Sequence, residues 1–388
     1  MLLRVNLLSL LIAFASPQRA AAATPAPTPA PMPAPMPTAP GIEARNWILI
    51  DFASGQTLAE SQPDQKIEPA SLTKLMSAYV IFNALRDGRL KLDEPILISE
   101  HAWRAEGSRT FVQVGTRVPV EVLLKGMIVQ SGNDATIALA ERVGGSEPAF
   151  VQMMNAWAKR LGMNGTHFED ASGLPSPSHY STARDLAILS RAIVRDFPEY
   201  YPIYSLREYT WNNIRQENRN GLLERDPSVD GIKTGHTESA GYCLISSARR
   251  QGMRLVSVVL GAKGVREREN GSAALLAYGF NFFENVTLRK RGETVLMSRV
   301  YKGSEQYFAA VTAADVQISV PHGQGLSITT RTTLQRPLMA PLTTATVIGE
   351  LQVDLGGKTV MRVPLYPAVA IAVGGWWRRM LDTISLWF

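Results

Sequence analysis

The chain has 388 residues, of which 45% are hydrophobic and 19% are charged, and its formal net charge is +6. This balance is typical of a globular protein long enough for two or more domains and a sizeable core. No dense Lys/Arg run and no basic patch interleaved with aromatic residues occurs, so the sequence does not indicate nucleic-acid binding.

The first 23 residues predict a signal peptide. Arg4 precedes an apolar run, Leu7 to Ala15, that is too short to span a membrane comfortably, and small residues of the kind that signal peptidase cuts follow at 21–23. Residues 24–41 carry a proline at nearly every second position, which favours an extended Pro/Ala-rich linker and cannot pack a core. The chain is therefore expected to be exported.

Periodic patterns predict an α/β domain over residues 42–285. Two short strands should flank a turn at Ser54 and Gly55, and a helix should begin at Ser71 and end before Gly88. The order of strands and helices favours an antiparallel sheet flanked by helices. The further expected elements are helices at 119–130, 134–145, 148–163 and 181–197, strands at 229–236, 240–248 and 253–262, and a helix from Val265 to about Phe283.

Two other segments differ from this pattern. The stretch from Asn164 to Ser181 is polar and rich in Gly, Pro and Ser, which predicts a long loop of the kind that is often functional. Residues 286–370 contain short β-type runs separated by Gly and Pro, which predict a small all-β domain.

Residues 373–388 predict an amphipathic helix. Its polar face carries Arg378 and Arg379, and this mixture of Trp and Arg suits a helix that lies in a membrane interface. The alternative is a terminal helix docked on its own domain. The apolar face holds Trp377, Met380, Leu381, Ile384, Trp387 and Phe388.

Three short motifs follow one another within the α/β domain: SLTK at 71–74, SGN at 131–133 and KTG at 233–235. The first two are individually common, but all three in their expected local contexts rarely occur together by chance. This combination is typical of penicillin-binding proteins and β-lactamases.

The chemistry of a serine nucleophile explains these residue types. Ser71 needs a base, and Lys74 lies one helical turn later on the same face. A lysine accepts a proton only when it is neutral, and burial together with a second cation, Lys233, would lower its pKa. Ser131 can relay a proton to a leaving group, and Asn133 can hold the lysine or a substrate amide.

The third motif suits a substrate with an anionic end. Lys233 and Thr234 can bind a carboxylate, and Gly235 lets a substrate backbone approach the strand. The backbone N–H groups of Ser71 and His236 can form an oxyanion hole.

Other catalytic arrangements have less support. The sequence contains neither a G-x-S-x-G nor an H-E-x-x-H motif, although spacing alone leaves a zinc cluster or a Ser-His-Asp triad open. No metal or other cofactor is expected. The one cysteine, Cys243, cannot form an intramolecular disulfide, and its apolar neighbours indicate a small buried side chain. The histidines are scattered at His101, His167, His179, His236 and His322.

Beyond the motifs, the chain resembles the low-molecular-mass penicillin-binding proteins of the D-alanyl-D-alanine carboxypeptidase family. The stretches EPASLTKLM, MIVQSGNDA, NRNGLL and VDGIKTGHTESAGYCL carry the resemblance, which extends from about Ile42 through the β domain and the tail. It implies a transpeptidase-like fold and removal of the last D-alanine from peptidoglycan stem peptides through an acyl-serine. It also implies covalent binding of β-lactams and a role in cell-wall biogenesis and cell shape.

The resemblance also implies roles for individual residues. Ser71 matches the acylated serine and Lys74 the base. In GVREREN, Arg268 matches an arginine that helps to bind the terminal carboxylate, with Arg266 as the competing assignment. The loop before Ser181 matches an Ω-type loop that affects deacylation, but it lacks the E-x-x-x-N of class A β-lactamases. The other matching residues are Ser131, Asn133, Lys233 and Thr234.

The leading interpretation is a serine-type D-Ala-D-Ala carboxypeptidase held peripherally on the periplasmic side of the inner membrane. Its expected partners are stem peptides, β-lactams and the membrane surface, with no nucleic acid and no particular oligomeric state. A DD-endopeptidase and a β-lactamase share the motifs and remain open, as does a catalytically silent wall-binding protein.

Overall fold

The computed structural model describes residues 36–387. The expected signal peptide, most of the Pro/Ala-rich linker and Phe388 lie outside these residues. Residues 36–41 contain no helix or strand.

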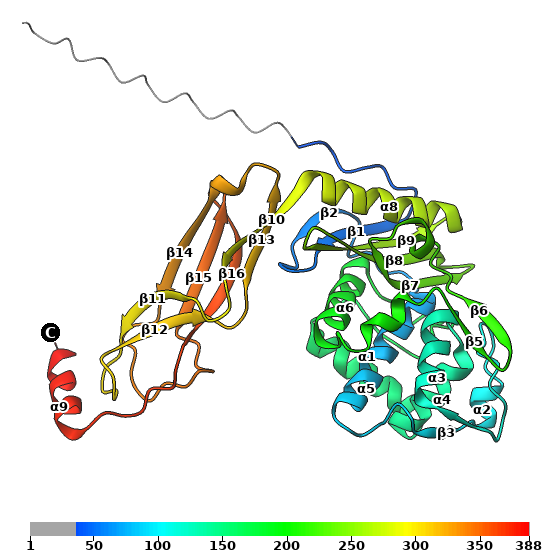
Figure 1. Cartoon of the computed structure of the whole chain (residues 1–388), viewed down its shortest axis with the longest axis horizontal. Helices are drawn as coiled ribbons and strands as arrows, with labels where there is room; N and C mark the ends of the chain where they lie inside the picture. The colour runs from blue at the N-terminus through cyan, green and yellow to red at the C-terminus, as the bar shows by residue number, and fades with distance from the viewer. Residues whose placement is uncertain (1–35, 388) are drawn as a thin grey trace, which may run out of the picture. The chain divides into compact units, whose positions relative to one another are not determined.

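A five-stranded antiparallel sheet in the order β2-β1-β9-β8-β7 lies at the centre of the α/β domain (Figure 1). Its strands bury apolar side chains on both faces, because successive side chains point to opposite sides. In β1, Ile48 and Ile50 join one core cluster, whereas Trp47 and Leu49 join the other. The expected antiparallel sheet is confirmed, with β1 at Asn46–Asp51, β2 at Thr57–Ser61, β7 at Val229–Thr237, β8 at Gly241–Arg250 and β9 at Met253–Ala262.

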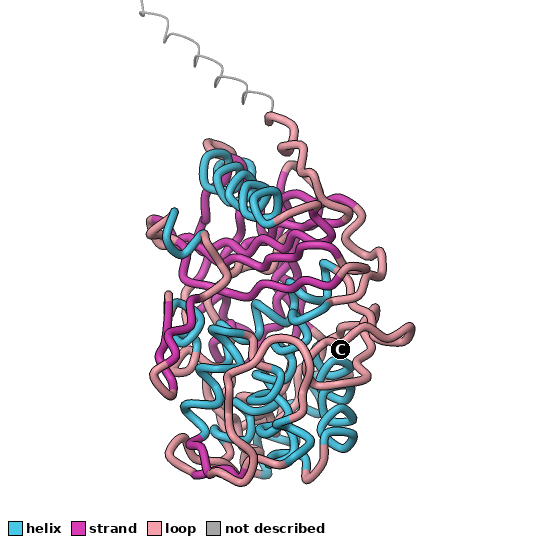
Figure 2. Tube along the Cα trace, turned by 90° about the vertical axis from the view of Figure 1, so that its right-hand side faces the viewer, coloured by secondary structure: helices cyan, strands magenta, loops and turns pink. Residues whose placement is uncertain are grey.

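Helices cover both faces of this sheet (Figures 1 and 2). Helix α8 (Val265–Phe282) packs on β8 and β9, and Gly279 allows the close approach because a Cβ there would lie 2.4 Å from Leu255 Cδ1. On the opposite face, α6 (Ala183–Asp196) begins at Thr182, whose side chain accepts a hydrogen bond from the N–H of Asp185. The remaining helices are α1 at Lys74–Arg86, α2 at Glu100–Trp103, α3 at Val120–Lys125, α4 at Asn133–Gly144, α5 at Glu147–Leu161 and α7 at Leu222–Arg225.

Helix α1 is buried on every side, from Lys74 to Leu85. A helix without a polar face belongs in the middle of a domain rather than on its surface. The first residue of α1 is therefore placed inside the protein, and so is any side chain that functions there.

Several short elements carry no periodic signal in the sequence. The strand pairs β3–β4 and β5–β6 have only three or four residues per strand, too few to establish an alternation. These elements are β3 at Pro95–Leu97, β4 at Arg117–Pro119, β5 at Glu208–Trp211, β6 at Ile214–Glu217, and the 3₁₀ turns η1 at Ala70–Thr73 and η3 at Tyr201–Ser205.

The expected all-β domain is confirmed. A five-stranded antiparallel sheet in the order β11-β12-β16-β15-β14 and the pair β10–β13 share one core, to which Phe308, Ile318 and Leu351 contribute. Its strands are β10 at Phe283–Arg289, β11 at Thr294–Arg299, β12 at Tyr307–Thr312, β13 at Val316–Pro321, β14 at Ile328–Leu334, β15 at Gly349–Leu355 and β16 at Lys358–Pro367, with a short 3₁₀ turn η4 at Gly325–Ser327.

The terminal helix α9 spans Trp376–Ser385, inside the range expected from the sequence. Within residues 36–387, no helix combines the length and the apolar character needed to cross a membrane.

Candidate active site

Ser71 lies in the 3₁₀ turn η1, immediately before α1 begins at Lys74. The helix expected from Ser71 therefore starts as a tighter turn. Lys74 Nζ lies 3.1 Å from Ser71 Oγ and 2.7 Å from the carbonyl oxygen of Ser172. Ala70, just before the serine, has a φ of +48°, which residues with a Cβ rarely adopt. The turn thus holds a hydroxyl and an amine in contact at the cost of local strain.

Lys74 is buried, with only 2% of the residue exposed. Burial lowers the pKa of Lys74 to about 7, assisted by the charge of Arg219 and opposed by the carboxylates of Asp170 and Asp134. A free lysine titrates near about 10.4, so at pH 7 roughly half of the Lys74 side chains are neutral. This lysine can accept a proton under ordinary conditions.

The SGN motif follows a single π-helical turn, η2 (Gly126–Gln130). Such turns are frequent at functional sites. Ser131 adopts the left-handed conformation with φ +67°, and its buried Oγ has no hydrogen-bond partner among the described residues. Asn133 is fixed by its Nδ2, which donates to the carbonyl of Glu106 at 2.5 Å, while its N–H donates to the carbonyl of Ser108 at 2.7 Å. The Ser131 hydroxyl is therefore available to accept and donate a proton.

Asp134, directly after this motif, positions the loop opposite it. Its buried carboxylate accepts the N–H groups of residues 110–112 at 2.7, 2.9 and 3.3 Å. The same loop carries Gly107 and Ser108, which line the candidate site. Sequence reasoning missed this residue, because its partners lie more than twenty residues away.

The KTG motif lies on β7, an edge strand of the sheet. Lys233 is buried, and its Nζ donates to the carbonyl of Thr234 at 3.1 Å. Burial lowers the pKa of Lys233 well below its ordinary value, and the charges of Lys74, Arg219 and Arg268 lower it further. Two lysine amines and two guanidinium groups therefore share a confined region.

Gly235 and His236 complete the motif strand. A Cβ at Gly235 would lie 3.1 Å from the carbonyl oxygen of Pro69 and 3.2 Å from Leu72 Cγ. Gly235 therefore lets β7 approach the turn η1, which carries Ser71, and it also lines the site. His236 is exposed, and its ring lies against Tyr242 with centroids 4.1 Å apart.

Two arginines reach the same region. Arg268 on α8 is buried and donates to the carbonyls of Cys243 at 3.5 Å and Arg219 at 3.2 Å. Arg266, its competitor in the sequence, is exposed and is not part of the lining of the hollow. Arg219 lines the hollow but was assigned no role from the sequence, although it lies in the quoted NRNGLL stretch. Cys243 is buried, as expected.

These elements enclose a hollow of about 410 Å³. Three of the predicted site residues, Lys74, Asn133 and Lys233, are buried and do not belong to its lining. The lining consists of Ser71, Gly107, Ser108, Ser131, Arg219, Thr234, Gly235, His236 and Arg268.

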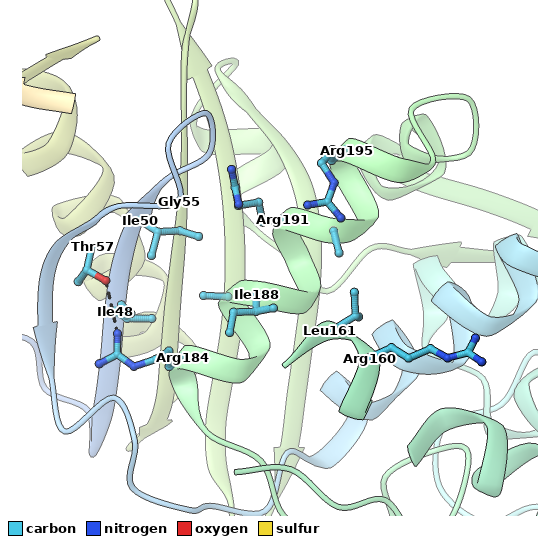
Figure 3. Close-up of a pocket in the computed structure, with 12 residues that line it drawn as sticks. Ile48, Ile50, Gly55, Thr57, Arg160, Leu161, Arg184, Ile188, Arg191 and Arg195 are labelled. Carbon is cyan, nitrogen blue, oxygen red and sulfur yellow. Dashed lines mark hydrogen bonds between the residues drawn. The ribbon is translucent and has the colours of Figure 1, made fainter. Parts of the chain in front are cut away.

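Another hollow, of about 420 Å³, is lined by residues of β1, β2, α5 and α6 (Figure 3). Of its arginines, Arg184 and Arg195 are paired with carboxylates, and Arg191 donates to main-chain carbonyls. No residue of the three motifs lines it, so it is not the candidate active site.

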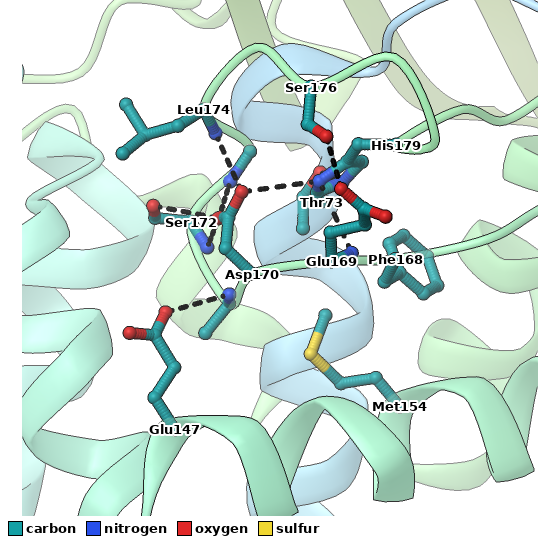
Figure 4. Close-up of polar contacts among 12 residues, drawn as sticks. Thr73, Glu147, Met154, Phe168, Glu169, Asp170, Ser172, Leu174, Ser176 and His179 are labelled. Atoms are coloured by element: carbon teal, nitrogen blue, oxygen red, sulfur yellow. Dashed lines mark hydrogen bonds and ion pairs between the residues drawn. The ribbon is translucent and has the colours of Figure 1, made fainter.

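Of the alternatives left open by the sequence, the triad has one partial counterpart. His179 Nε2 lies 2.9 Å from Thr73 Oγ1, and its Nδ1 lies 3.2 Å from Asp170 Oδ2 (Figure 4). Thr73 is fully buried, so its hydroxyl cannot attack a substrate. Within residues 36–387, no group of three His, Cys, Asp or Glu side chains could hold a metal ion.

Comparisons with known proteins identify the family to which the chain belongs. The family described as D-alanyl-D-alanine carboxypeptidase matches residues 34–264, and the penicillin-binding protein 5 C-terminal domain matches residues 283–372. The chain is 43% identical over 358 residues to the D-alanyl-D-alanine carboxypeptidase DacC of Escherichia coli strain K12, covering 90% of each protein. It is similar to the crystal structure of penicillin-binding protein 5 from Haemophilus influenzae, with 40% identity and a TM-score of 0.80 over 86% of this chain and 99% of that chain. It is also similar to penicillin-binding protein D2 from Listeria monocytogenes in the ampicillin-bound form, with 32% identity and a TM-score of 0.58 over 63% of this chain and 100% of that chain.

The Lys74 side chain is expected to lose its proton near pH 7, because burial penalises the charged amine. Nuclear magnetic resonance of lysine-labelled protein between pH 5 and 10 measures this directly, with Lys74→Met identifying the resonance. A Lys74 signal that stays protonated above pH 9 would contradict the expectation.

Proposed function

Because the chain belongs to the D-alanyl-D-alanine carboxypeptidase family, we propose that Ser71 is the residue that is acylated when the terminal D-alanine of a peptidoglycan stem peptide is removed. The chain is a serine hydrolase and acts as a DD-carboxypeptidase. The observation that carries the residue assignment is the contact between Ser71 and Lys74, in which a hydroxyl lies 3.1 Å from an amine with a pKa of about 7.

In the acylation step, neutral Lys74 accepts the proton of Ser71, and Oγ attacks the carbonyl carbon between the two D-alanines. The oxygen that becomes negative is stabilised by the backbone N–H groups of Ser71 and His236. Ser131 passes the proton from Lys74 to the leaving amine, and D-alanine departs. Asn133 Oδ1, which has no partner among the described residues, accepts a substrate N–H. Water then hydrolyses the ester on Ser71 and restores the free serine.

The free carboxylate of the substrate distinguishes a carboxypeptidase from an enzyme that cuts internal bonds. The hydroxyl of Thr234 donates to this carboxylate, and Arg268 and Arg219 supply positive charge. Burial and the neighbouring positive charges lower the pKa of Lys233, and a bound carboxylate would stabilise its protonated form. Gly235 lies on β7, an edge strand of the sheet, and leaves room for the substrate backbone beside this strand.

β-Lactams are proposed to react at the same serine. Ser71 attacks the lactam carbonyl as it attacks the peptide, but the amine released from the ring remains attached to the acyl group. The covalent ester therefore persists. The similarity to the Listeria protein in its ampicillin-bound form supports this proposal.

We further propose that the exported chain lies on the periplasmic side of the inner membrane and is anchored by α9. The helix is held by its polar side: buried Asp382 accepts the N–H of Lys302 at 2.6 Å and faces Arg299 Nη2 at 3.2 Å. Its apolar side chains are exposed, with Trp377 at 69% and Trp387 at 82%. A helix docked through its apolar face would bury these side chains instead, so the arrangement supports the membrane anchor.

Removing Arg268 is expected to reduce turnover of a peptide ending in D-Ala-D-Ala far more than removing Arg266, because only Arg268 lines the hollow. Truncation of one charged partner of a buried pair costs about 2–5 kcal/mol, which corresponds to a loss of 30-fold or more. Arg268→Ala and Arg266→Ala are compared on the free acid and on its C-terminal amide. Equal losses in both variants, or an undiminished rate on the amide, would contradict the assignment.

Removing α9 is expected to release the enzyme from membranes without changing its turnover of a soluble peptide. The cut belongs after Gly375, because Ile371 is buried in the β domain and pairs with Leu342. Burial of apolar area contributes about 25 cal/mol per Å², and each arginine near anionic lipid on the order of 1 kcal/mol. Flotation with vesicles of anionic lipid compares the full mature chain, the truncated chain and a Trp377→Ser/Trp387→Ser variant. A mature chain that does not float would show that α9 is not an anchor.

A further inference from the structure

We propose that Asp170 and His179 are positioning residues that orient Lys74 through the carbonyl group of Ser172. Neither side chain lines the hollow that holds Ser71. The inference rests on the proposed roles of Ser71 and Lys74, and it assigns a task to the long polar loop before α6.

The carboxylate of Asp170 closes a tight turn within this loop (Figure 4). Its Oδ1 accepts the N–H groups of Ser172 and Gly173, each at 2.6 Å, and its Oδ2 accepts the N–H of Leu174 at 3.1 Å. Burial would raise the pKa of Asp170, but the contact with His179 and the backbone hydrogen bonds hold it at about 2. The Asp170 carboxylate is therefore charged near neutral pH, where it can accept all three N–H groups.

The turn that Asp170 closes places a hydrogen-bond acceptor beside Lys74, the proposed general base. The carbonyl oxygen of Ser172 lies 2.7 Å from Lys74 Nζ. A neutral amine has two N–H donors and one lone pair in fixed relative directions. When one N–H of Lys74 points at Ser172, the lone pair can be aimed at the hydroxyl of Ser71, 3.1 Å away. Without the acceptor, rotation about the terminal bond would point the lone pair elsewhere.

The turn that Asp170 closes packs directly against η1, the turn that carries Ser71. Gly173 has a φ of +93°, and a Cβ there would lie 1.8 Å from the carbonyl oxygen of Ala70. Only glycine can occupy such a position. A small displacement of the loop would therefore be transmitted to the residues around Ser71.

His179 ties this turn to α1. The ring is 1% exposed and connects Asp170 with Thr73, the neighbour of Lys74. The N–H of Glu169 also lies 3.5 Å from Nδ1, but the charged carboxylate is closer, at 3.2 Å. We therefore assign the proton to Nδ1, which donates to Asp170, while Nε2 accepts from the hydroxyl of Thr73.

Other contacts hold the loop independently of this pair. The N–H of Ala171 donates to Glu147 Oε1 at 3.0 Å, and Ser77 Oγ donates to the carbonyl of Ala171 at 2.6 Å. Loss of the pair is therefore expected to shift the Ser172 carbonyl rather than to release the whole loop.

The test uses Asp170→Asn, His179→Gln and His179→Asn in the full mature chain. Glutamine places its amide near the Nε2 position and loses the donor to Asp170, whereas asparagine places its amide near Nδ1 and can keep that donor. Glu169→Gln is the matched control, because Glu169 is the exposed neighbour whose carboxylate accepts a hydrogen bond only from Ser176 among the described residues. Turnover is measured per active site, after titration with a penicillin, on a soluble D-Ala-D-Ala peptide at pH 8.5.

At that pH Lys74 is mostly neutral, so a lost rate reports orientation rather than protonation. Asp170→Asn and His179→Gln are expected to lower kcat about tenfold or more, within the roughly 10²-fold that a misplacement of 1 Å can cost, with KM changed less than about twofold. His179→Asn should recover most of the lost kcat, and Glu169→Gln should behave as the wild type.

Wild-type kcat per active site in Asp170→Asn and His179→Gln would overturn the inference, and so would a defect confined to the melting temperature or to the active fraction. An equal loss in Glu169→Gln would also overturn it. Mass mapping of the penicillin adduct on the wild type distinguishes failure of the proposed function from failure of the proposed role of Asp170 and His179. A label elsewhere than Ser71 defeats the proposed function, whereas a label on Ser71 with unchanged variants defeats only the role of the pair.

Discussion

A lysine amine kept inside the protein with 2% exposure is the constraint on which the rest of the structure depends. Burying an ammonium ion is costly unless it is paired, and the alternative is a lowered pKa. The fold places Lys74 at the start of a helix that is buried on all sides, between a sheet and the surrounding helices. The carboxylates of Asp134 and Asp170 lie close enough to oppose the shift but do not cancel it. The pKa of Lys74 therefore stays at about 7, where the amine can both accept and return a proton.

The segments around this amine are held by hydrogen bonds from side chains to the backbone and by unusual backbone conformations rather than by regular structure. Ala70, Ser131 and Gly173 all have positive φ, and each lies directly in or beside the turn that presents a functional group. Carboxylates at Asp134 and Asp170 each close a turn by accepting consecutive N–H groups. Such conformations persist only where their surroundings over-determine them, and the carboxylates of Asp134 and Asp170 supply several of the hydrogen bonds that do so.

The sequence predicted the parts of this arrangement that are local or periodic. Strands β8 and β9 are short runs rich in apolar residues, helix α6 begins after the capping residue Thr182, and the three motifs indicate their chemistry by their residue types. The contacts of Asp170 and His179 could not be predicted, because Lys74 and Thr73 lie about a hundred residues before the loop that meets them. The expected role of Gly235 was incomplete for the same reason: its space is shared with Pro69 and Leu72 of a distant turn. For α9, the pattern predicted the apolar face, but not that Asp382 would hold the opposite face.

Neutral Lys74 is the proposed base that activates Ser71. The most direct measurement is the rate constant of acylation by a fluorescent penicillin between pH 5 and 9, for the wild type and for Lys74→Arg, which cannot deprotonate in this range. The wild-type rate is expected to fall about tenfold per pH unit below pH 7 and to level off above it, since only the neutral fraction of Lys74 reacts. Lys74→Arg is expected to fold but not to be acylated. A wild-type rate that is independent of pH, or an arginine variant acylated at the wild-type rate, would contradict this role of Lys74.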